Sequence, residues 1–187
     1  MSKNNRHHKL FQETILVHLD SAYNYARWLC RDAHDAEDVT QEAFTRAFTA
    51  FDSFKYANPK SWLLTIVRHT FLNLKQKEQR QGDVIYLDAT FQHENIQNEL
   101  SDPVTPEKNL LRQHESELIH KAINELTTEF REIIVLRELE GFSYNEIALI
   151  TECALGTVMS RLSRARNQLK SILTSVTGKA EHSENEA

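Results

Sequence analysis

The stretch GFSYNEIALITECALGTVMSRLSRARNQLK, residues 141–170, decides how the second half of this 187-residue chain folds. Ser143 fits a helix N-cap and Glu146, three residues later, completes a capping box, so a short helix is expected over 144–151. A turn at ECALG follows, and Thr157 marks the N-cap or first turn of a second helix. One face of that helix is apolar, with Val158, Leu162, Ala165 and Leu169 at helical spacing. The stretch therefore predicts a helix-turn-helix.

A further helix is expected just before this stretch. Gly141 ends it at the C′ position, where a left-handed backbone is common. Its apolar face consists of Leu126, Phe130, Ile133, Ile134, Leu136 and Leu139. The C-terminal part of the chain is thus expected to be wholly helical.

The last helix of the stretch is strongly basic. From Ala154 to Lys170 the chain has four cations and no Asp or Glu, although its formal net charge is -5. Four polar or basic residues lie together on one side of the helix: Thr157, Ser160, Arg161 and Arg164. A helix in the major groove faces a polyanion, which repels acids, whereas Arg contacts phosphates or guanine edges. DNA contact is favoured over the alternative, an Arg-rich helix that is merely exposed to solvent.

Composition predicts an all-α protein of two small domains. Gly (4) and Pro (3) are scarce, and no short alternation of apolar and polar residues recurs. The acidic stretch over 81–105 contains Pro103, has few aliphatic residues after Leu87, and predicts a flexible linker. The expected organisation is an N-terminal helical domain over 10–80, this linker, a C-terminal helical domain over 106–174 and a disordered tail over 175–187.

Other classes of protein are disfavoured by what the sequence contains. No apolar run approaches the roughly 18 residues of a membrane span, and the start lacks a signal peptide's apolar core, so a cytoplasmic protein without membrane insertion is expected. Cys30 and Cys153 stand far apart without a CxxC motif, and inert burial is favoured over oxidant sensing. Metal binding by residues 34–38 is disfavoured because neighbours on a helix do not converge on one ion. No catalytic residue, metal or cofactor is predicted, and an enzyme is not expected.

The stretch LRELEGFSYNEIALITECALGTVMSRLSRAR, which begins at Leu136, resembles region 4 of the bacterial extracytoplasmic-function sigma factors. The family pattern runs close to LR-x-L-x-G-x-SY-x-EIA, a turn, then GTV-x-SR-x-x-RAR. In that family this domain is a helix-turn-helix that reads the minus-35 promoter element and leans on the flap of the polymerase β subunit. The resemblance implies minus-35 contacts by Thr157, Ser160, Arg161 and Arg164.

Two departures from that pattern bear on the site. Glu152-Cys153-Ala154 stands where family members often have Gly-x-Pro, and Met159 replaces a common basic residue. Met159 either shifts affinity and the preferred DNA sequence or simply packs at the edge of the domain core. The sequence leaves both interpretations open.

The N-terminal half carries a second resemblance. The stretch DAHDAEDVTQEAFTRAF, from Asp32, is similar to region 2.2 of the same family. Its acids crowd the first turns of a helix, where they favour the positive end of the helix dipole. The resemblance implies docking on an Arg-rich coiled coil of the polymerase β′ subunit by Asp38, Gln41, Glu42 and Arg46. The alternative, for this segment alone, is a solvated acidic helix start.

A third motif, WLLTIVRHTFLN from Trp62, is similar to regions 2.3 and 2.4. Basic residues and aromatics alternate around it, and such surfaces capture unstacked bases at about 1–3 kcal/mol per base. The resemblance implies recognition of the minus-10 element by Tyr56, Lys60, Ser61, Arg68, His69 and Lys75. His69 stands where Asn is frequent, and it either alters the base pocket or caps a surface. Trp62 is expected in the core.

The resemblance therefore predicts an alternative sigma factor. Such a protein binds core RNA polymerase through the β′ coiled coil and β flap, reads two promoter elements and assists melting of the DNA. An anti-sigma factor is a further expected partner, and in the family the linker threads the polymerase cleft. Two other hypotheses remain: a free-standing helix-turn-helix regulator, which leaves DAEDVTQEAF unexplained, and a sigma-like decoy for an anti-sigma factor, against which Arg161 and Arg164 argue.

Overall fold

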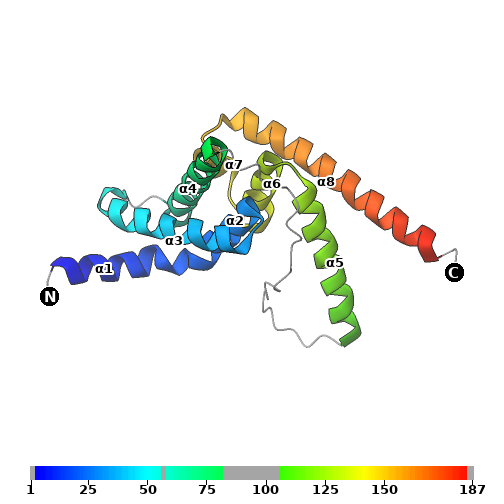
Figure 1. The fold of residues 1–187 in the computed structure, drawn as a ribbon, viewed down its shortest axis with the longest axis horizontal. Coiled ribbons are helices and arrows are strands. Elements are labelled where there is room, and N and C mark those ends of the chain that lie inside the picture. Colours follow the sequence, from blue (N-terminus) through cyan, green and yellow to red (C-terminus); the bar gives the residue numbers. More distant parts are fainter. Residues whose placement is uncertain (1–2, 56–57, 82–105, 185–187) are drawn as a thin grey trace.

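The computed structural model describes residues 3–55, 58–81 and 106–184, and every regular element within these ranges is a helix. The predicted all-α fold is confirmed. Figure 1 shows the helices gathered around a central body, from which α1 and the end of α8 extend in opposite directions. Within the described ranges, no helix is both long and apolar enough to span a bilayer.

The first helical domain is built on three helices that pack against one another, α2, α3 and α4. Its elements are α1 (Lys3–Thr14), the 3-10 turn η1 (Leu16–His18), α2 (Leu19–Cys30), α3 (Ala33–Ala50), the 3-10 turn η2 (Phe51–Ser53) and α4 (Pro59–Gln81). Asp32 caps α3, since its carboxylate accepts the backbone N–H of Asp35 at 3.0 Å. Small buried side chains on α3, at Ala36, Ala43 and Ala47, allow close packing.

The second helical domain contains the predicted helix-turn-helix. Its elements are α5 (Pro106–Glu125), α6 (Thr128–Ile134), the π-helix η3 (Val135–Leu139), α7 (Tyr144–Thr151) and α8 (Leu155–Glu184). Gly141 has a φ of 75° and ends the helix before α7. The capping box of Ser143 and Glu146 is present at the start of α7, as predicted.

Two expectations about this domain are corrected. The helical period places Leu139 on the apolar face, but this residue is 52% exposed. The π-turn at 135–139 inserts an extra residue per turn and so rotates the positions after it away from the core. The predicted disordered tail over 175–187 is described as helix as far as Glu184, because a helix already nucleated by packing extends where no Pro stops it. Residues 185–187 lie outside the described ranges.

The two helical domains pack directly against each other. α4 lies against α7, and α2 lies against α6, so that one continuous core contains buried residues from both domains. Figure 1 shows α4, α7, α2 and α6 together at the centre of the molecule. The predicted linker over 81–105 lies, apart from Gln81 at the end of α4, outside the described residues. Helices that the sequence assigned to separate domains therefore form one interface.

Candidate nucleic-acid interface

The first candidate surface is the basic face of α8. Val158, Leu162 and Ala165 are buried, which turns the predicted DNA-contacting side of the helix outward. On that side Ser160 and Arg164 are exposed, while Thr157 and Arg161 are half-buried. The Arg161 guanidinium lies 3.4 Å from the carboxylate of Glu129 on α6. The structure thus brings all four predicted minus-35 residues onto one accessible face.

Met159 lies beside this face and is 52% exposed. Met159 is not among the partly buried apolar side chains that pack against the core, although about half of its surface is covered. An exposed Met next to Ser160 offers apolar surface where a basic residue would offer a charge. An altered affinity and sequence preference stays a prediction.

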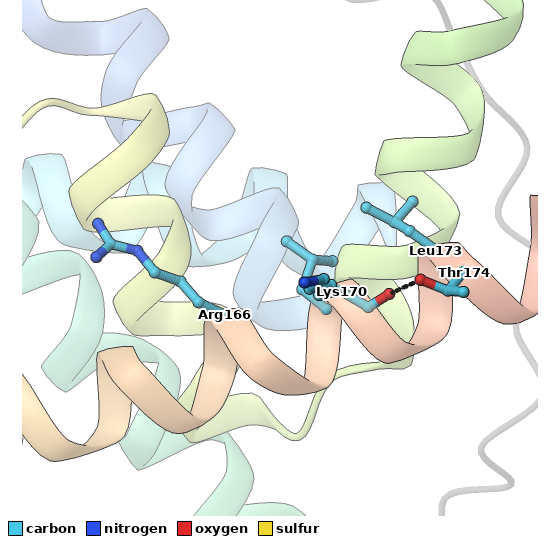
Figure 2. Close-up of a pocket in the computed structure, with 5 residues that line it drawn as sticks. Arg166, Lys170, Leu173 and Thr174 are labelled. Carbon is cyan, nitrogen blue, oxygen red and sulfur yellow. Dashed lines mark hydrogen bonds between the residues drawn. The ribbon is translucent and has the colours of Figure 1, made fainter.

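Further along α8 is a groove that was not anticipated from the sequence. It has a volume of about 340 Å³ and is lined by Arg166, Leu169, Lys170, Leu173 and Thr174. Figure 2 shows these side chains along one side of α8, with the Thr174 hydroxyl donating to the Lys170 carbonyl at 2.9 Å. Arg166 also donates to Glu138, at 2.6 Å, and this hydrogen bond raises the pKa of its guanidinium. In the sequence, the i, i+4 spacing of Leu169 and Leu173 was the signal that could have indicated an apolar strip at this groove.

The second candidate surface is the outer face of α3. The predicted polymerase-binding residues Asp38, Gln41, Glu42 and Arg46 are all exposed there. Arg46 donates its Nε–H to Glu42 at 2.7 Å. Gln41 also borders an apolar groove of about 500 Å³, whose other lining residues are Phe11, Leu16, Leu19, Thr40, Phe44, Thr45, Phe48 and Thr49. Sequence reasoning missed this groove, although Leu16 and Leu19 are each 42% exposed.

The third candidate surface is α4, where the structure separates the predicted minus-10 residues. Tyr56 lies outside the described residues. Ser61 is buried, and its backbone N–H donates to the Asn58 side chain at 3.1 Å in the first turn of the helix. In this conformation Ser61 is not a surface residue, and its predicted contact with DNA is not supported. Lys75 pairs with Glu78 at 2.9 Å, one helical turn further on.

The remaining three minus-10 candidates face carboxylates of the second domain. The pairs are Lys60 Nζ with Glu140 Oε2 at 2.8 Å, Arg68 Nε with Glu132 Oε1 at 2.9 Å, and His69 Nε2 with Glu152 Oε1 at 3.0 Å. Glu132 also accepts the hydroxyl of Tyr25 at 2.8 Å. Burial, and then the nearby Glu132 charge, raises the pKa of that phenol. None of these pairings was expected from the sequence.

The two cysteines are free thiols. Cys30 is buried, and burial raises the pKa of its thiol to about 12. Cys153 is half-buried, with its sulfur 3.1 Å from the Thr151 hydroxyl. Over the described ranges, no three His, Cys, Asp or Glu side chains are gathered so that they could hold a metal ion.

The chain matches two protein-family models. Residues 14–81 match sigma-70 region 2, and residues 116–169 match sigma-70 region 4. The chain is 35% identical over 146 residues to the RNA polymerase sigma-H factor of Pseudomonas aeruginosa, in a match that spans 76% of this chain and 75% of that protein. The extracytoplasmic-function sigma-E factor of Escherichia coli is 36% identical over 138 residues, 72% of each chain. The chain belongs to the extracytoplasmic-function sigma factors of RNA polymerase.

A solved structure agrees with this assignment. The sigma factor has a TM-score of 0.72 and 32% identity with the sigma factor RpoE of Bartonella quintana, solved in complex with the anti-sigma factor NepR. The match covers 89% of this sigma factor and 98% of RpoE. The predicted function, promoter-directed initiation of transcription by RNA polymerase, is confirmed at the level of the family. The hypothesis of a free-standing regulator is therefore set aside.

Proposed function

We propose that this sigma factor reads the minus-35 element through α8 and the minus-10 element through α4. It binds core RNA polymerase through α3 and does not itself catalyse a reaction. The observation that carries the proposal is the division of α8 into a buried apolar face and an outward basic one. An outward face with two arginines and two hydroxyls suits a major groove, where Arg hydrogen-bonds guanine and hydroxyls contact bases or phosphates.

The outer face of α3 suits the polymerase. Asp38, Gln41, Glu42 and Arg46 are exposed along it, which supports contact with the Arg-rich β′ coiled coil. The apolar groove beside Gln41 adds a surface whose burial by a partner would stabilise the complex. On the second domain, the groove at Leu169 and Leu173 is the surface that we assign to the β flap.

For the minus-10 element we retain Tyr56, Lys60, Arg68, His69 and Lys75. We leave Ser61 out of this set. It lies in the first turn of α4, where its backbone N–H donates to the Asn58 side chain and its own side chain is buried. We keep the division into domains over 10–80 and 106–174. We also infer an anti-sigma partner, because the similar RpoE was captured with one, and a cytoplasmic location, where core polymerase works.

The direct test is transcription in vitro from a genomic fragment library, with purified core polymerase, with and without this protein. New transcript starts that share a two-part upstream motif are the expected result. Tight core binding without new starts would favour the decoy hypothesis. Absence of core binding would overturn the proposed function.

Replacing an outward arginine of α8 tests the minus-35 assignment. Arg164→Ala removes a cation and several hydrogen-bond donors without touching the core, so transcription from the promoters found above is expected to fall. A base-contacting Arg contributes about 1–3 kcal/mol, which corresponds to roughly a 5- to 150-fold loss of affinity. Arg6→Ala, which removes an exposed cation from α1, is the matched control. Equal losses in both variants would show a general charge effect rather than promoter contact.

A further inference from the structure

Exposed apolar side chains lie at the start of α8, beside its basic face. Leu155 and Met159 are 44% and 52% exposed, and their i, i+4 spacing makes them neighbours on the helix surface. Leu149 of α7, the helix that packs against α8, is 70% exposed. Single exposed apolar side chains are common, but three within one helix-turn-helix are apolar surface that the core of the domain does not use.

The packing of α8 leaves Met159 outside the core. Val158 and Leu162, one position before it and three after, are at most 1% exposed, so Met159 lies on the flank next to the outward Ser160. Figure 1 shows the start of α8 at an edge of the molecule. Because no Asp or Glu occurs from Ala154 to Lys170, the charge around this apolar flank suits an anionic partner. DNA is the partner that this charge fits.

Gly156 is an independent sign of a close partner at the same place. It lies in the first turn of α8, although glycine is a poor helix former. Neither its backbone nor its surroundings in the described part of the chain require glycine. Its φ is not left-handed, and a Cβ at this position would meet no atom within 4 Å. A glycine that the fold does not need leaves room for a ligand to approach the backbone closely.

Ser160 adds a hydrogen-bond acceptor beside Met159. Its hydroxyl donates to the Thr157 carbonyl at 3.0 Å, so its single hydrogen is already used and its oxygen faces outward as an acceptor. In the major groove the base donors are adenine N6 and cytosine N4, and only the adenine pairs with a base that carries a methyl group. An acceptor next to an apolar side chain therefore suits an A·T pair.

We propose that Met159 reads an A·T base pair of the minus-35 element by contact with the thymine C5-methyl, while Gly156 lets the DNA approach the start of α8. Apolar side chains recognise this methyl in the major groove, and the N-terminal residues of a recognition helix reach the base edges. Met159 lies in the second turn of α8, and its flexible thioether chain adapts to an apolar neighbour. The inference rests on the proposed role of α8 and assigns one base pair within it.

The experiment first locates the base pair. Transcription from the genomic fragment library is repeated with core polymerase and full-length Met159→Ala, whose side chain ends at Cβ. We expect the original protein to select an A·T pair at one position of the upstream motif. The variant should lose the preference at that position alone. Leu139→Ala, which also shortens a side chain that is 52% exposed, is the matched control and should leave the motif unchanged.

The second step removes only the methyl group. In one promoter from this set, the thymine at that position is replaced by deoxyuridine, which keeps the same hydrogen-bonding edge. Gel shifts measure the affinity of core polymerase with this protein for both promoters. The original protein and Leu139→Ala should bind the deoxyuridine promoter about fourfold more weakly, as expected for one buried methyl. Met159→Ala should bind the two promoters equally.

Gly156→Ala tests the close approach. Its urea midpoint should equal or exceed that of the original protein, because alanine is the better helix former and its Cβ meets no neighbour. Its affinity for the thymine promoter should nevertheless fall several-fold, since the added methyl stands where the DNA approaches. A folded variant with weaker binding cannot be explained by loss of structure.

Two results would overturn the inference: an equal effect of deoxyuridine on the original protein and Met159→Ala, or unchanged promoter binding by Gly156→Ala. Either result would leave an upstream motif that depends on Arg164, and with it the proposed function, intact. If the original protein selected no upstream motif at all, the proposed function and this inference would both fail.

Discussion

At the scale of single residues, the left-handed caps are where this chain departs from ordinary backbone preference. A non-glycine residue in this conformation costs about 1–2 kcal/mol, yet Arg31 and Glu152 both adopt it. Glu152 stands where related proteins often have glycine, so the departure was visible in the sequence. The pairing of Glu152 with His69 was not visible in the sequence, because the two residues are far apart along the chain and only folding brings them together.

Cys30 and Cys153 are expected to differ in reactivity. With a pKa of about 12, only about one Cys30 thiol in 10⁴ is ionised at pH 8, and burial also blocks access. Cys153 is half-buried and should react first with iodoacetamide. Mass spectrometry of the folded protein is expected to show alkylation at Cys153 while Cys30 remains free. In urea both should be modified, and equal labelling of the folded protein would contradict an inert Cys30.

At the scale of elements, the short helix α7 depends on its N-terminal cap. The Glu146 carboxylate accepts the backbone N–H of Ser143 at 2.9 Å and its hydroxyl at 2.7 Å, while the Ser143 oxygen accepts the backbone N–H of Glu146 at 3.3 Å. α7 has eight residues, too few to be stable alone, so these bonds matter to the helix-turn-helix.

Glu146→Gln is expected to destabilise the protein in a pH-dependent way. The backbone hydrogen bond from Ser143 is the main cause that lowers the pKa of Glu146 in the folded state. A lowered folded pKa means that the stabilisation is fully present above the unfolded pKa, about 4.3, and is lost as the pH falls through the folded value. Urea unfolding should separate the variant from the original protein at pH 7 and bring the two together at acidic pH.

The companion variant for this prediction is Ser143→Ala. Loss of an N-cap hydroxyl costs about 1 kcal/mol, and this cost should be visible at pH 7 as a lower urea midpoint with an unchanged slope. A difference between Glu146→Gln and the original protein that stays constant from pH 7 to acidic pH would contradict the role of the Glu146 charge.

At the scale of the whole molecule, Glu132 joins the two domains. It accepts hydrogen bonds from Tyr25, which is fully buried, and from Arg68, and the sequence separations are 107 and 64 residues. Polar groups removed from water in this way depend on one another, because losing one leaves the others without a partner.

Replacing Glu132 tests that dependence. Glu132→Ala leaves the Tyr25 hydroxyl and the Arg68 guanidinium without their shared acceptor and should lower the free energy of unfolding by about 3 kcal/mol. Glu132→Gln retains an acceptor oxygen and should cost less. Urea unfolding followed by circular dichroism measures both variants. If both variants lowered the free energy of unfolding by the same small amount, the interface would open at little cost before the domains unfold.

Prediction from sequence worked best where the signal was local. The capping box at Ser143, the stop at Gly141 and the buried face of α8 all depend on residues within a few positions of one another. It failed at Leu139, where a π-turn shifts the register, and at Ser61, where the first turn of α4 faces the core. Neither feature has a composition that distinguishes it from an ordinary exposed helix.

The sequence indicated a sigma factor only through its resemblance to regions 2 and 4 of that family. By itself it determined an all-α chain with a basic helix near its C-terminal end, an acidic helix start and a cationic helix α4. These structural properties follow from helical periods, caps and charge patterns, which act between neighbours in the chain. Only the tertiary structure decided that the cations of α4 meet Glu132, Glu140 and Glu152. The charge pattern along one helix is the same whichever distant residues it later contacts. A pairing across the domains therefore forms only once the helices have packed.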